Sequence, residues 1–261
     1  MSINDFDLKN WKELSDIWTD SLWIIKSRDN SGAHDGYYHG NFIPQIPNQL
    51  LRRFTKAGDY VLDPFVGSGT TLIEAQRLNR NSIGIELLED VATEAKNRIA
   101  TEAKKEITAE IHVGDSCSIE TDMLLKLYNI KNVQFIIYHP PYWDILKFSQ
   151  DNRDLSNTKS LDKFLSALKS VLKNTIKILE KNRYCALVIG DKYTNGELIP
   201  LGFHCMQAFQ EEGLKLRSVI VKNFDETKAK SNKQAIWRYR ALAGSFYIFK
   251  HEYIFLFKKT K

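Results

Sequence analysis

Two closely spaced glycines stand between an apolar run and a helical pattern in YVLDPFVGSGTTLIEAQRLNRNSIGIE, residues 60–86. Glycines at this spacing let the backbone turn sharply and approach a ligand without a Cβ in the way. The helix expected over residues 70–78 would offer free N–H groups at its start. Gly67 and Gly69 therefore indicate a ligand-binding turn between a strand and a helix, although a tight turn without a ligand would use the same residues.

The residues around this turn disfavour two common phosphate-binding motifs. The dinucleotide fingerprint requires a third glycine where this chain has Leu72, and a P-loop requires a lysine that the turn lacks. Asp63 ends the first expected strand and could accept hydrogen bonds from an ammonium group. Glu86 ends the next strand, where an acidic side chain binds the two hydroxyls of a ribose. An amino acid joined to a nucleoside fits both carboxylates, and S-adenosyl-L-methionine is the common example.

A second candidate site follows another apolar run. Residues 132–138 predict a strand that is buried on both faces, and His139-Pro140-Pro141-Tyr142 follow it directly. Consecutive prolines fix φ and free the preceding carbonyl from any strand ladder. The four residues therefore predict a rigid rim at the end of a buried strand.

The two motifs together resemble those of a known enzyme family. The run DPFVGSGTT, residues 63–71, resembles the cofactor motif of the amino-methylating DNA methyltransferases, which act on adenine N6 or cytosine N4. The run HPPY, residues 139–142, resembles their D/N/S-Pro-Pro-aromatic catalytic turn. The resemblance extends over about residues 38–258. It implies a three-layer α/β/α, Rossmann-like class I methyltransferase sheet, mostly parallel with an antiparallel last strand.

The resemblance also implies roles for individual residues. An exocyclic amine is a poor nucleophile because its lone pair is delocalised into the ring, so the family places two hydrogen-bond acceptors beside it. Here these would be His139 and the carbonyl of Pro140, with Pro141 stiffening the turn and Tyr142 stacking on a base flipped out of the duplex. The residues expected to bind the cofactor are Asn41, Phe42, Pro44, Asp63, Pro64, Phe65, Gly67, Ser68, Gly69, Thr70, Glu86 and Asp115. No metal is expected, because methyl transfer depends on orientation and on the leaving group.

His139 departs from the family pattern at the first position of the catalytic turn. A neutral imidazole can still accept one hydrogen bond, so activity is expected to fall below pH 6, where both ring nitrogens become donors. The departure leaves the choice between adenine and cytosine open. It also leaves a catalytically inactive nucleic-acid-binding subunit of a methyltransferase complex as an alternative. An RNA amino-methyltransferase would share every motif and is a second alternative.

The segment over residues 222–240 is basic. Six lysines and arginines against two acidic residues leave it at +4, most of the +5 of the whole chain. Aromatic residues alternate with the basic ones, a combination suited to phosphate contacts and base stacking, although a solvated loop is the alternative. The predicted nucleic-acid contacts, in a loop over the cleft, are Lys228, Lys230, Lys233, Trp237, Arg238 and Arg240.

Alternating strands and helices must position these sites. Helices are predicted over residues 8–23, 47–54, 70–78, 87–106, 160–179 and 198–210. Strands are predicted over residues 60–63, 82–86, 107–113, 132–138, 184–189, 216–221 and 246–257. Residues 143–159 predict a mobile loop beside the catalytic turn. We expect residues 1–36 to form an N-terminal arm and residues 37–261 to form the catalytic domain.

Length and composition are typical of one α/β domain. The chain has 261 residues, 43% of them hydrophobic and 26% charged, and its net charge favours polyanionic partners. Three scattered cysteines predict reduced core thiols, and neither a signal peptide nor a membrane span is expected. We therefore expect a cytoplasmic protein of a bacterium or archaeon, at the nucleoid, acting on duplex DNA in restriction-modification. RNA, a homodimer or a partner subunit stay open as partners.

Overall fold

Apolar runs form the strands of one eight-stranded sheet in the computed structural model, which describes residues 2–34, 38, 40–224 and 234–260. The strand order is β1-β9-β10-β6-β5-β2-β3-β4. β10 is antiparallel to both of its neighbours, whereas the other pairs are parallel. The predicted fold is therefore confirmed. The strands are β1 (Leu22–Trp23), β2 (Tyr60–Asp63), β3 (Asn81–Glu86), β4 (Ala109–Val113), β5 (Val133–Tyr138), β6 (Leu179–Ile189), β9 (Lys215–Asn223) and β10 (His251–Lys258).

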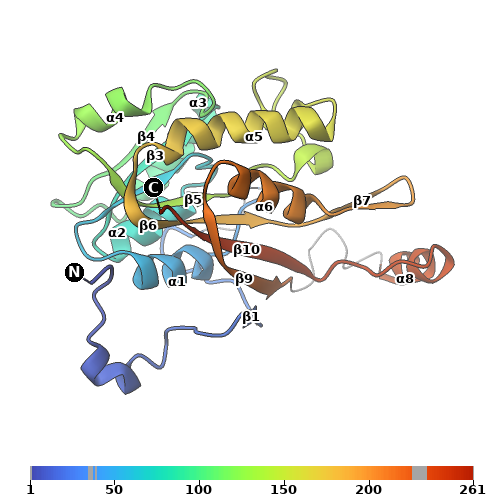
Figure 1. Ribbon diagram of the computed structural model, residues 1–261, viewed down its shortest axis with the longest axis horizontal. Coiled ribbons are helices and arrows are strands. Elements are labelled where there is room, and N and C mark those ends of the chain that lie inside the picture. Colours follow the sequence, from blue (N-terminus) through green and yellow to red (C-terminus); the bar gives the residue numbers. More distant parts are fainter. Residues whose placement is uncertain (1, 35–37, 39, 225–233, 261) are drawn as a thin grey trace.

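Helices cover both faces of this sheet (Figure 1). They are α1 (Gln45–Phe54), α2 (Thr70–Arg77), α3 (Glu89–Ala100), α4 (Thr121–Leu127), α5 (Leu161–Ile176), α6 (Leu201–Glu211) and α8 (Gln234–Ala243). Val61 packs with α1, whereas the next residue, Leu62, packs with α5, because consecutive side chains of a strand point to opposite faces. Among the described residues, no helix is long and apolar enough to cross a membrane.

The prediction of a helix over residues 8–23 is wrong. Only a 3-10 helix, η1 (Leu8–Glu13), forms, and β1 then pairs with β9 at the edge of the sheet. Between them, the Ile17 N–H still donates to the Leu14 carbonyl at 3.1 Å, but Trp18 bonds to α1. The Trp18 N–H donates to Gln49 Oε1 at 2.8 Å, and Arg53 donates to the Trp18 carbonyl at 2.9 Å. Helical spacing of apolar residues was therefore outweighed by tertiary hydrogen bonds. The division of the chain at residue 36 stays a prediction.

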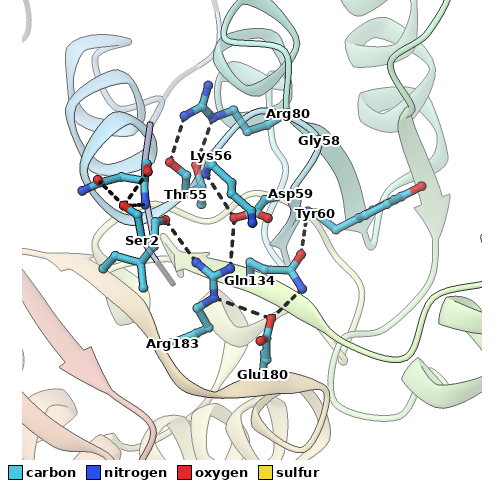
Figure 2. Close-up of polar contacts among 12 residues, drawn as sticks. Ser2, Thr55, Lys56, Gly58, Asp59, Tyr60, Arg80, Gln134, Glu180 and Arg183 are labelled. Carbon is cyan, nitrogen blue, oxygen red and sulfur yellow. Dashed lines mark hydrogen bonds and ion pairs between the residues drawn. The ribbon is translucent and has the colours of Figure 1, made fainter. Parts of the chain in front are cut away.

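A polar network ties the first residues to the amino-terminal edge of the sheet (Figure 2). Arg183 on β6 contacts Asp59 Oδ2 at 3.3 Å and Glu180 Oε2 at 3.5 Å, and donates to the carbonyl of Ile3 at 3.1 Å. Gln134 on β5 donates to the same Glu180 carboxylate at 2.8 Å. The network holds the start of the chain at this edge and leaves the carboxyl edge free for a site.

Two segments near the carboxyl edge differ from the sequence-based expectation. The predicted mobile loop over residues 143–159 contains the 3-10 helices η2 (Trp143–Ile145) and η3 (Leu155–Asn157), with Leu155 and Ser156 buried. Sequence analysis missed the hairpin of β7 (Lys192–Thr194) and β8 (Glu197–Ile199), which extends beside α8 away from the sheet (Figure 1). Asn195-Gly196, both with positive φ, form its two-residue turn and were the available signal. Tyr193 of β7 stacks on Phe246 after α8, with ring centroids 4.3 Å apart.

The cysteines agree with the prediction of free thiols. Cys185 and Cys205 are buried in the core between the sheet and α5 and α6. Cys117 is half-buried, and burial raises the pKa of its thiol to about 12. All three side chains therefore serve as small packing groups.

Candidate active site

The glycine turn connects β2 to α2 as the sequence predicts. Gly67 has φ +50° and Gly69 has φ +84°, a region in which an L side chain is strained. A Cβ on Gly67 would lie 3.1 Å from the ring of Tyr38, and a Cβ on Gly69 would lie 3.3 Å from Ile99. Both glycines are thus required by backbone conformation and by close packing.

Glu86 ends β3 and faces this turn. Its Oε2 accepts a hydrogen bond from the Gly67 N–H at 2.9 Å, and its Oε1 accepts one from the Leu88 N–H at 3.0 Å. Burial raises the pKa of this carboxyl. A carboxylate offers about four acceptor positions, so acceptor capacity remains for a ligand. Asp115, after β4, lines the same space and accepts from the Cys117 N–H at 2.8 Å, so it also stabilises a turn.

Asp63 lies behind the wall of the site. Its side chain is buried, and Oδ1 accepts a hydrogen bond from the Phe65 N–H at 2.9 Å. Burial raises the pKa of this carboxyl to about 6, because the charged form loses its hydration. Asp63 therefore stabilises the turn through its hydrogen bond with Phe65, and a direct contact with an ammonium group stays a prediction.

The segment before α1 forms the opposite wall. Thr70 at the start of α2 donates a hydrogen bond to Asn41 Oδ1 at 2.7 Å. Phe42 is buried, and its ring meets the His139 ring edge-on with centroids 4.6 Å apart. This segment therefore spans from the glycine turn to the catalytic turn.

The catalytic turn begins where β5 ends. The His139 ring is half-buried between Phe42 and Tyr142, whose centroid lies 5.6 Å away. Burial lowers the pKa of His139 to about 4, so the imidazole is neutral well below pH 6. With this pKa we expect the loss of activity near pH 4 instead of below pH 6, because of a desolvation that the sequence could not show. Among the described residues, nothing donates a hydrogen bond to the His139 ring or to the Pro140 carbonyl.

Two charged residues missed as site residues complete the wall beside Tyr142. The Tyr142 hydroxyl donates to Glu252 Oε2 at 2.6 Å, and Lys222 Nζ contacts Glu252 Oε1 at 2.9 Å. Lys222 was expected in an exposed basic loop, but it is buried at the end of β9. A charged residue inside each of two apolar strands, VIVKN and HEYIFLF, was the available signal.

One cavity of about 590 Å³ unites the two motifs. Its volume falls within the range of roughly 300–1,000 Å³ that is typical of small-molecule sites. The predicted site residues that line it are Asn41, Phe42, Pro64, Phe65, Gly67, Ser68, Thr70, Glu86, Asp115, His139, Pro140, Pro141 and Tyr142. Pro44, Asp63 and Gly69 do not line it. Two arginines that sequence analysis did not assign to the site, Arg28 and Arg153, also line it.

The predicted nucleic-acid contacts that the structure describes lie away from the cavity. Trp237, Arg238 and Arg240 are on α8, which stands away from the sheet (Figure 1), and none of them lines the cavity. The predicted loop is thus a helix over these positions. Lys228, Lys230 and Lys233 lie outside the described residues. Arg238 and Arg240 are exposed, and the Arg240 guanidinium lies 5.3 Å from the Trp237 ring centroid.

Comparison with known proteins gives matches of two kinds. A family model described as DNA methylase matches residues 4–97 and 133–261. The Type II methyltransferase M2.DpnII of Streptococcus pneumoniae is 41% identical over 96 residues, which cover 35% of this chain and 32% of that protein. The Type II methyltransferase M.MjaII of Methanocaldococcus jannaschii is 48% identical over 86 residues, covering 30% and 16%. This chain thus spans at most about a third of these relatives.

Solved structures share the fold. TrmN from Thermus thermophilus superposes with a TM-score of 0.53 at 17% identity, covering 84% of this chain and 49% of that one. At this identity, the likeness concerns the arrangement of strands and helices alone.

Proposed function

This chain belongs to the DNA methylase family, and on that premise we propose that it methylates an exocyclic amine of a base in duplex DNA. The fold and the family imply S-adenosyl-L-methionine as the methyl donor. The target would be adenine N6 or cytosine N4 in a base flipped out of the helix. The observation that carries the proposal is the single cavity lined by both the glycine turn and the catalytic turn.

The residues at one end of the cavity fit the cofactor. Gly67 lines the cavity without a Cβ, which would crowd the Tyr38 ring, and Glu86 has acceptor capacity left for ribose hydroxyls. Asn41, Phe42 and Asp115 line the same cavity, whereas Pro44 and Asp63 do not. When bound, the cofactor supplies an electrophilic methyl group carried by a sulfonium.

The residues at the other end fit an amine of low nucleophilicity. A neutral His139 imidazole and the Pro140 carbonyl can each accept one N–H of the amine, which favours a pyramidal nitrogen with an available lone pair. Pro141 would keep the carbonyl fixed, and the Tyr142 ring, held through its hydroxyl, would stack on the base. Orientation of the two reactants in one cavity would supply most of the rate enhancement.

DNA contacts outside the cavity would come from α8. The described helix Gln234–Ala243 contains no acidic residue, and Arg238 and Arg240 are exposed on it. Trp237 lies among them, and Lys228, Lys230 and Lys233 precede the helix in the sequence. We propose that these side chains contact phosphates and bases beside the flipped nucleotide.

The biological setting is inferred from the relatives. Proteins named Type II methyltransferases in Streptococcus pneumoniae and Methanocaldococcus jannaschii are similar to about a third of this chain. We propose a role in restriction-modification, in the cytosol of a bacterium or archaeon at its nucleoid DNA. A homodimer or a partner subunit stays a prediction, which the mass of the protein in solution would test.

The decisive experiment combines the purified protein, labelled S-adenosylmethionine and unmethylated duplex DNA, followed by digestion to nucleosides. N6-methyladenosine or N4-methylcytidine, in the deoxy form, is the expected product. Tyr142→Ala should abolish it, whereas Tyr247→Ala should not, because Tyr247 is 95% exposed. Transfer to RNA alone would indicate an RNA amino-methyltransferase. Absence of both transfer and cofactor binding would indicate an inactive subunit.

A further inference from the structure

A buried ion pair lies in the wall of the cavity, and the proposed chemistry does not use it. Lys222 on β9 and Glu252 on β10 are direct partners in the antiparallel register, with Nζ and Oε1 2.9 Å apart. Their side chains are only 7% and 5% exposed. Removing two charges from water is costly, and replacing such a pair by apolar residues is often neutral or stabilising. Stability is therefore a weak explanation for this pair.

The two partners are not equally satisfied. Both carboxylate oxygens of Glu252 are engaged, one by Lys222 and the other by the Tyr142 hydroxyl. The Lys222 ammonium has three donors, and in the described part of the chain Glu252 is its one hydrogen-bond acceptor. Its other close neighbour is the Phe224 ring, whose centroid lies 4.8 Å away. Two N–H donors of a buried cation that lines the cavity are thus available to a ligand.

Strand order places this cation at the base end of the cavity. The glycine turn, Glu86 and Asp115 follow β2, β3 and β4, which lie on one side of β5. Lys222 and Glu252 belong to β9 and β10, which lie on the other side of β5 beyond β6. The catalytic turn at the end of β5 separates the two regions. The ammonium is therefore on the side of the cavity away from the cofactor end.

We propose that Lys222 donates a hydrogen bond to an acceptor nitrogen in the ring of the target base, and so helps to select that base. The inference rests on the proposed function and names a specificity residue for it. Glu252 is a positioning residue, because it holds both the Lys222 ammonium and the Tyr142 hydroxyl. Adenine and cytosine carry unprotonated ring nitrogens that accept a hydrogen bond from an ammonium group. A base with a C–H or an N–H in place of that ring nitrogen offers the ammonium group no acceptor.

The test uses target bases that lack one ring nitrogen but keep the amine. Duplexes carry 1-, 3- or 7-deazaadenine, or 3-deazacytosine, at the position that the wild type methylates. kcat/KM is measured for wild type, Lys222→Met and the double variant Lys222→Met, Glu252→Gln. The double variant replaces the single variant if the latter fails to fold, because it leaves no unpaired buried charge. Lys258→Met is the control, because Lys258 is on β10, lies over the Tyr184 ring and does not line the cavity.

The expected result is a loss of discrimination. Wild type and Lys258→Met should use one deaza substrate about 10- to 100-fold less well than the normal base, the factor expected for a hydrogen bond to a charged group. In the Lys222 variants this ratio should fall by about the same factor. Intrinsic differences between the substrates affect wild type and variants alike, so they cancel when the two ratios are compared. A merely structural role would lower both substrates equally and keep the wild-type ratio, which would overturn the inference alone. A wild type that methylates no duplex would overturn the proposed function, and the inference with it.

Discussion

Lowering the pH from 7 to 5 should destabilise this protein partly through His139. Burial between Phe42 and Tyr142 lowers the pKa of this histidine to about 4, from 6.5 in the unfolded chain. Between these two values the unfolded chain binds a proton that the folded protein does not. The free energy of unfolding therefore falls progressively as the pH is lowered from 6.5 to 4, and the full loss that is due to His139 is reached below pH 4.

The size of the effect follows from the same two pKa values. A tenfold change in proton affinity corresponds to about 1.4 kcal/mol, which gives a full effect of about 3 kcal/mol below pH 4. Between pH 7 and pH 5 the linkage relation gives a loss of about 2 kcal/mol. Other titrating groups, including His112 and Asp63, also contribute over this range. A second variant is therefore needed to isolate His139.

His139→Asn provides that comparison, because asparagine does not titrate and can still accept a hydrogen bond from an amine. Urea unfolding at pH 7 and pH 5 should show that wild type loses about 2 kcal/mol more than this variant. Equal losses in the two proteins would refute the argument from desolvation. Catalysis gives an independent check, since neutral His139 should support kcat down to about pH 4. An acid limb near pH 6.5 that disappears in His139→Asn would contradict the lowered pKa.

Three further predictions follow from individual contacts. Gly67→Ala should weaken cofactor binding in a calorimetric titration more than Gly58→Ala does, because both glycines have positive φ but only a Cβ at Gly67 would crowd an aromatic ring. An equal effect of the two substitutions would argue against cofactor binding at the glycine turn. Tyr142→Phe should lower the free energy of unfolding by about 1–3 kcal/mol, because Glu252 Oε2 loses its donor. The ring should still support activity. A loss of kcat as large as that of Tyr142→Ala would show that the hydroxyl, not the ring, matters. Arg183→Ala should cost about 3 kcal/mol in thermal or urea unfolding by leaving the buried Asp59 carboxylate without its ion-pair partner. The kcat of the folded protein should not change, because the network lies at the other edge of the sheet, and a changed kcat would contradict this separation.

The parts of the site that the sequence predicted are contiguous in the chain. The glycine turn and the catalytic turn depend on local backbone properties, positive φ at Gly67 and Gly69 and fixed φ at Pro140 and Pro141. Buried apolar runs such as VQFIIY likewise predicted the strands that carry these turns. Local pattern and tertiary structure agree there, because the same residues determine both.

The errors arose where hydrogen bonds or charges found partners far along the chain. A helix was expected over residues 8–23, but backbone groups of Asp16 and Trp18 bond to Gln49 and Arg53 on α1. The charge run over 222–240 predicted an exposed loop, yet it begins with a buried lysine and ends in a helix. Composition describes how polar a segment is, and it cannot show which polar group is paired inside the protein.

By itself, the sequence determined the type of fold, the two motifs and the order in which they follow their strands. Only the tertiary structure decided that Lys222 meets Glu252, 30 residues away, and that this pair stands beside Tyr142. It also decided that His139 is desolvated enough to stay neutral in mild acid. Such properties depend on which strands become neighbours and on how much water their packing excludes, and neither is a local property of the chain.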